Sequence, residues 1–109
     1  MRPVRLTVGS QTTSAVIPIS NYTSPVNVGV GVKLSAGASL TYTVEHTFDD
    51  VQAANFNPAT ATWYQNSGLT SQTASKDGNY SYPVTGVRLN VGTYASGNAT
   101  ITVIQAGEK

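Results

Sequence analysis

The most informative feature of this 109-residue chain is how little charge it carries. Only 10% of its residues are Asp, Glu, Lys or Arg, against roughly 25% in an ordinary soluble domain. Six basic and five acidic side chains leave a formal charge of +1. Nucleic-acid binding relies on many cations that displace counterions from the phosphate backbone. We therefore expect no nucleic-acid partner.

Several further absences narrow the classes of function. The chain has no cysteine, which excludes disulfides, thiol nucleophiles and thiolate metal sites. No apolar run approaches the roughly 20 residues that a membrane-spanning helix needs. The first residues contain no apolar signal region, so we expect neither export by the usual route nor membrane insertion. The length suits one domain, which we predict to span residues 1–109.

What the chain does have is alternation of apolar and polar residues, the period of a half-buried β-strand. Strong runs occupy residues 4–8, 15–19, 28–34, 40–48, 87–91 and 99–104, and weaker ones 62–65 and 80–83. Pro18 indicates an edge strand or bulge for the second run, and residues 1–10 are expected to form an edge strand or an N-terminal arm. Helical periodicity is missing. The pattern predicts an all-β fold: an antiparallel two-sheet sandwich, jelly-roll-like, with about six to eight strands.

Turn-forming residues lie between the runs. Residues 35–38 and 95–98 are short enough to join neighbouring antiparallel strands as hairpins, and Asp77-Gly78-Asn79 is typical of a tight turn. Residues 50–61 are weakly patterned and are interpreted as a long crossing connection. The residues expected in the core are Val30, Val32, Tyr42, Val44, Leu89, Ile101 and Val103.

Candidate chemistry is sparse. His46 is the only histidine, and strand alternation places it on the apolar face with Val44 and Phe48, away from Glu45 and Asp49. We interpret it as a packed histidine and not as a metal ligand or catalytic base. Asp49 and Asp50 with the Asp77 turn offer oxygen ligands for calcium, but a strand end and a turn account for those residues. We predict no enzymatic activity, no catalytic residue, no metal and no cofactor.

Aromatic residues are the best candidates for contact with a partner. Trp63 and Tyr64 follow the long connection, and Tyr80 and Tyr82 follow the Asp-Gly turn. Exposed Tyr and Trp suit protein interfaces and also stack on sugar rings. Filling the ends of the sandwich is the alternative role for these four side chains.

Five segments together resemble small structural proteins of tailed bacteriophages, and most closely the capsid decoration (cement or staple) proteins. These segments are residues 24–32 (SPVNVGVGV), 40–50 (LTYTVEHTFDD), 56–64 (FNPATATWY), 82–91 (YPVTGVRLNV) and 99–107 (ATITVIQAG). None is a catalytic motif, so the resemblance concerns overall pattern and transfers no functional residue.

The resemblance implies a β-sandwich or jelly roll that sits across joints between capsomers, commonly as a dimer. Its partners would be the major capsid protein and copies of itself. The protein would be made in the bacterial host cytoplasm and lie on the outer capsid surface. Arg2 and Arg5 would pair with acidic groups of the shell, although simple solubility is the favoured explanation for both. The alternative is a tail or neck component, such as a carbohydrate- or receptor-binding module using Trp63, Tyr64, Tyr80 and Tyr82.

Overall fold

The computed structural model describes residues 4–19, 28–51, 53–80 and 84–105. Within them the chain forms eight strands and no helix long or apolar enough to cross a bilayer. The strands are β1 (Val4–Val8), β2 (Ile17–Pro18), β3 (Val28–Leu34), β4 (Ser39–Thr47), β5 (Tyr64–Gln65), β6 (Lys76–Tyr80), β7 (Gly86–Ser96) and β8 (Ala99–Gln105). The strong predicted runs are therefore confirmed, with β7 longer and β2 shorter than expected, and the weak run 62–65 corresponds to β5. The weak run 80–83 is not confirmed, because β6 ends at Tyr80 and residues 81–83 lie outside the described residues.

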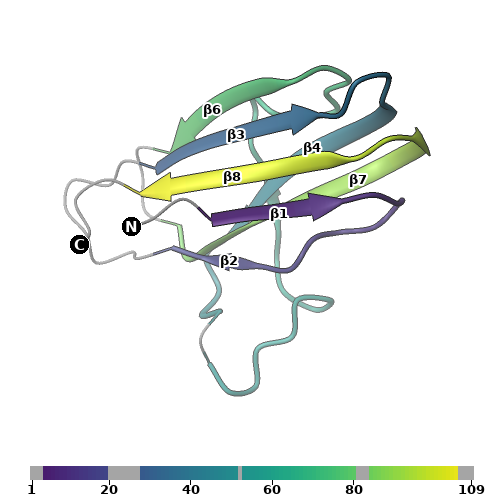
Figure 1. Cartoon of the computed structure of the whole chain (residues 1–109). Helices are drawn as coiled ribbons and strands as arrows, with labels where there is room; N and C mark the ends of the chain where they lie inside the picture. The colour runs from purple at the N-terminus through teal and green to yellow at the C-terminus, as the bar shows by residue number, and fades with distance from the viewer. Residues whose placement is uncertain (1–3, 20–27, 52, 81–83, 106–109) are drawn as a thin grey trace.

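The strands form two antiparallel four-stranded sheets (Figure 1). Sheet A has the order β1-β8-β3-β6 and sheet B the order β2-β7-β4-β5. Strand pairs run β1 with β8, β2 with β7, β3 with β6 and β4 with β5, as in one long hairpin rolled up on itself. This is a jelly roll, and the predicted sandwich is confirmed. Both β1, at one edge of sheet A, and β2 with its Pro18 are edge strands, as expected.

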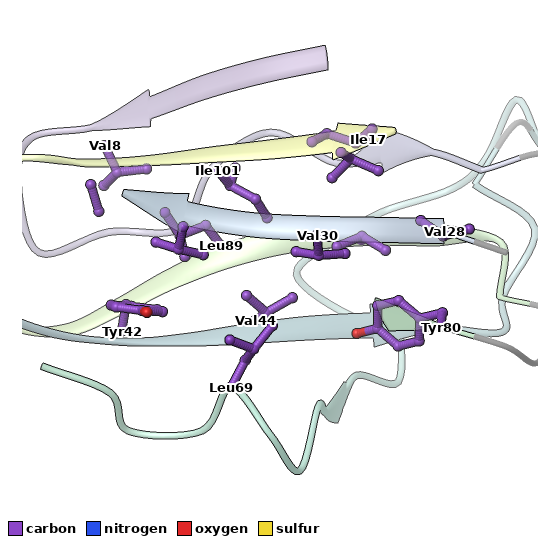
Figure 2. Packing of buried hydrophobic residues seen from close by; sticks show 14 of the residues in the cluster. Val8, Ile17, Val28, Val30, Tyr42, Val44, Leu69, Tyr80, Leu89 and Ile101 are labelled. Carbon is purple, nitrogen blue, oxygen red and sulfur yellow. The ribbon is translucent and has the colours of Figure 1, made fainter. Parts of the chain in front are cut away.

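The core lies between the sheets (Figure 2). All seven residues predicted to be inside are buried. Their strands alternate as a pleated sheet requires: in β3, Val28, Val30 and Val32 point inward while Gly29 and Lys33 point outward. Leu69, from the segment between β5 and β6, is fully buried as well. Local alternation thus predicts which face of each strand is covered.

Two of the predicted hairpins are wrong. Residues 35–38 connect β3 to β4. Of the predicted turn 95–98, residues 97 and 98 connect β7 to β8, and in both connections the two strands lie in different sheets. Both turns instead cross from sheet to sheet and dock against one another. The Ser35 amide donates to the Asn98 carbonyl at 3.0 Å, and the Asn98 amide donates to Ser35 Oγ at 3.0 Å. A short turn can join two strands of one sheet or two strands of different sheets. The length of these turns therefore does not reveal to which sheet each strand belongs.

The predicted Asp-Gly turn is also wrong. Asp77, Gly78 and Asn79 lie inside β6, where Gly78 pairs with Val30. A Cβ added to Gly78 would stand 3.1 Å from Leu69 Cδ1, so a small residue is needed here because Leu69 packs over it. This tertiary contact explains a glycine that local rules assign to a turn.

A long loop, described at residues 48–51 and 53–63, joins β4 to β5, which are neighbours in sheet B, so it is not a crossing connection. Its ends are tied together: Thr47 Oγ1 donates to the Thr62 carbonyl at 2.8 Å, and the Thr62 amide donates to Asp49 Oδ2 at 2.9 Å. In Figure 1 the loop extends away from the sandwich. It is a compact loop with close ends, held by its own hydrogen bonds.

Candidate functional site

The end of β4 carries the main concentration of aromatic and ionisable side chains. Because adjacent residues of a strand face opposite sides, Glu45 points to the outer surface of sheet B and His46 to the inner. The paired strand β7 places Arg88 beside Glu45, and β5 places Tyr64 beside His46. Two separate clusters result, one on each side of the sheet.

On the outer side, Arg88 links an acid and an aromatic ring. Its Nε donates to Glu45 Oε1 at 2.8 Å, and the two side chains are only 15% and 11% exposed. Its guanidinium carbon lies 3.9 Å from the centroid of the Trp63 ring, a cation–π contact. Trp63 Nε1 in turn donates to the Pro58 carbonyl at 2.9 Å. This chain of contacts fastens the long loop to sheet B.

On the inner side, His46 contacts three aromatic rings. The ring centroids of Tyr80, Phe48 and Tyr64 lie 4.9, 5.7 and 5.9 Å from that of His46. Phe48 and Tyr64 also touch edge to face at 5.5 Å. Both are about half exposed, at 53% and 50%. We call these two side chains the aromatic patch; it is the apolar surface at this end of the sandwich.

His46 is a packing residue, as the alternation predicted. It is 4% exposed, and its Nδ1 is hydrogen-bonded to the Tyr80 hydroxyl at 2.9 Å. Burial lowers its pKa from 6.5, because a desolvated imidazolium is disfavoured. The imidazole is therefore neutral at pH 7. Among the described residues, no three His, Cys, Asp or Glu side chains gather where a metal could bind.

The predicted contact residues fare differently. Arg5 is exposed on β1, whereas Arg2 and Tyr82 lie outside the described residues. Tyr80 is fully buried at the end of β6, so its assignment as a surface contact is wrong. Its strand faces β4 across the core, and its hydroxyl is used by His46.

Trp63 and Tyr64 do not form one platform. Trp63 lies with Arg88 on the outer side of sheet B, and Tyr64 stacks with His46 on the inner side. Because Arg88 covers one face of the Trp63 ring, that face is not open to a sugar. Of the four predicted aromatic residues, only Tyr64 is both described and largely exposed.

Two features were missed. Phe48 was placed on the apolar face of its strand, but β4 ends at Thr47 and leaves its ring exposed; the following Asp49-Asp50 pair was the available signal. The outer face of sheet A, with Gly29 and Ile104, was also overlooked. The sequence signal for this face was Ile104, an apolar residue that shares the outward side of the last run with Thr100 and Thr102.

Glu45 points outward, as predicted, yet it is buried, because the long loop brings Trp63 over that side of the sheet.

Comparison with known proteins adds nothing to this geometry. No protein-family model matches the chain, and neither the curated proteins nor the solved structures contain a significant match.

Proposed function

We propose that this protein is a structural component of a tailed-phage particle that decorates the capsid and stabilises it by bridging neighbouring shell subunits. The observation that carries the proposal is the strand pairing, β1–β8, β2–β7, β3–β6 and β4–β5. It describes a jelly roll, the architecture of many viral capsid domains. The resemblance of five segments to decoration proteins agrees with it.

The surface suits repeated weak contacts on a lattice. With 10% charged residues, few ions need to be stripped of water when the surface is covered. Weak contacts gain strength when the same contact recurs around one shell. Two surfaces are expected to touch shell subunits. One is the aromatic patch of Phe48 and Tyr64, and the other is the edge of β1 that pairs with no strand among the described residues, to which an extended segment of a shell protein would add as a further strand.

Copy number in the particle tests the proposal. Purified phage particles are digested and this chain is quantified against the major shell protein by mass spectrometry with isotope-labelled peptides. A ratio near one supports a lattice role. Absence from the particle overturns it.

The contact surface can be tested on emptied shells that lack the protein. Added recombinant protein is expected to bind, and the variant Phe48→Ser with Tyr64→Ser to bind more weakly. Thr93→Ala, which alters an exposed residue of β7 far from the patch, serves as the matched control and should bind like the parent. Equal binding by all three proteins would remove the patch from the interface.

A carbohydrate- or receptor-binding module of the tail or neck is the second candidate. The half-exposed Tyr64 ring beside Phe48 favours it, because such a surface can stack on a sugar. This candidate predicts only a few copies per hundred shell subunits. It also predicts glycan binding that is lost in Tyr64→Ala and kept in Thr93→Ala.

A further inference from the structure

The outer face of sheet A has a bare strip along β3. Gly29 and Gly31 point to this face, between outward residues of β8 on one side and of β6 on the other. A Cβ added to Gly31 would meet no atom within 4 Å, and one added to Gly29 would meet only the Ile104 carbonyl oxygen, at 3.9 Å. Nothing in the described fold needs these positions to be empty. Glycine in a strand often marks the close approach of another chain.

A ridge runs beside the strip. Ile104 of β8 is paired with Gly29, and Thr102 is paired with Gly31. Ile104 is 46% exposed, one of the three large apolar side chains left uncovered among the described residues. The face therefore has an exposed apolar side chain beside Gly29. At Gly31 it has a shallow hollow that is lined by Asp77 and Thr102 together with Lys33, Ser75 and Lys76.

Opposite charges stand at the two edges of the same face. The register aligns Arg5 of β1 with Thr102, Thr102 with Gly31, and Gly31 with Asp77 of β6. Arg5 and Asp77 thus end one row that crosses the whole sheet, and both are exposed.

We propose that this face binds a second copy of the same chain about a two-fold axis that runs parallel to the strands, between β8 and β3. Such a rotation places β8 of each copy over β3 of the other, and β1 over β6. Residues that are paired across the sheet in one copy stay level with the same set of paired residues in the other copy. Ile104 of each copy then lies over Gly29 of the other, which has no side chain to obstruct it, and Thr102 covers Gly31.

The same rotation sets Arg5 of each copy opposite Asp77 of the other, so that two ion pairs form at the rims. Lys33, the remaining outward charge of β3, falls opposite Thr100 and not opposite another cation. Each contact occurs twice, as an isologous interface requires. Complementarity of both shape and charge thus points to a second copy as the occupant.

The face is small. Four strands about 4.8 Å apart and about five residues long cover less than the roughly 800 Å² per partner of a standard interface. We therefore expect a weak, reversible dimer that forms at micromolar to millimolar concentration. The inference goes beyond the proposed function, because it depends only on sheet A and concerns association of the isolated protein with itself.

Sedimentation equilibrium of the purified protein, from about 10 µM to about 1 mM, tests it. The parent should dimerise reversibly, and Ile104→Asn, which alters an exposed position, should raise the dissociation constant at least about tenfold. Arg5→Asp and Asp77→Arg should each weaken the dimer, because each sets two like-charged pairs face to face. The double variant Arg5→Asp/Asp77→Arg should recover the affinity, because both ion pairs re-form with their signs exchanged.

A pair of glycine variants supplies the control. Gly31 and Gly92 both have no atom within 4 Å of an added Cβ, but Gly92 lies on β7 of sheet B. Gly31→Thr should prevent the dimer and Gly92→Thr should not. A parent that stays monomeric at 1 mM overturns the inference, as does a dimer that ignores the changes to sheet A. Neither result bears on copy number in phage particles, so the proposed function can fail or stand separately.

Discussion

The docking of the two sheet-crossing turns makes a sharp prediction for Gly97. Its φ is +86°, and an added Cβ would lie 2.5 Å from Ala38 Cβ, 2.6 Å from Ala38 Cα and 2.8 Å from Ser35 Oγ. Gly97→Ala must therefore both hold alanine in a left-handed conformation and push apart the two turns. Gly37 is the matched control: its φ is +73°, but an added Cβ would meet nothing within 4 Å.

Both substitutions place alanine in a left-handed backbone conformation, which lowers the free energy of unfolding. Only Gly97→Ala also adds a steric clash between the two turns. A left-handed alanine costs about 1–2 kcal/mol, partly offset by about 0.4–1 kcal/mol because alanine restricts the unfolded chain. Gly37→Ala should therefore lose between about 0 and 1.6 kcal/mol. Overpacking adds about 1–3 kcal/mol at Gly97. The difference between the variants measures this contact between the turns.

Urea unfolding followed by far-ultraviolet circular dichroism measures both variants. Gly97→Ala should show a midpoint well below that of Gly37→Ala with an unchanged m-value. Its melting temperature should be lower by about 4–8 °C for each kcal/mol. Equal losses in the two variants would refute the docking of residues 35–38 on residues 95–98, and with it our explanation of how both turns cross between the sheets.

Further predictions concern the core and the two clusters at the end of β4. Ile101→Ala should lose about 2–5 kcal/mol in urea titration, whereas Ile104→Ala, on the exposed face of the same strand, should lose less than about 1 kcal/mol. The lowered pKa of His46 means that the unfolded chain binds the proton more readily. The contribution of His46 to stability should therefore be full above pH 6.5 and be lost as the pH drops below it. His46→Gln should weaken this fall in the urea midpoint. Arg88→Ala should leave Glu45 with a largely buried, unpaired charge and cost about 3–5 kcal/mol. It should also shift the fluorescence of the single tryptophan to longer wavelength, and an unchanged spectrum would contradict the stacking of Arg88 on that ring.

The failures of sequence-based prediction at the candidate site share a cause. Tyr80 was expected at the surface because it follows an Asp-Gly pair, yet Gly78 belongs to a strand whose partner, Val30, lies 48 positions earlier in the chain. Glu45 was placed on the correct face, but its burial depends on a loop that brings Trp63 over sheet B. Neither outcome has a local signal, because each is decided by residues distant in sequence.

The sequence by itself determined the strand-rich fold, the inward face of the strongly alternating strands and the packed role of His46, because alternation is a property of neighbouring residues. The tertiary structure decided which strands share a sheet, because each turn could serve equally well within a sheet or between sheets. It also decided that Trp63 and Tyr64, adjacent in the chain, lie on opposite sides of sheet B. Pairing between distant strands depends on the whole chain packing at once, and no short stretch of sequence contains that information.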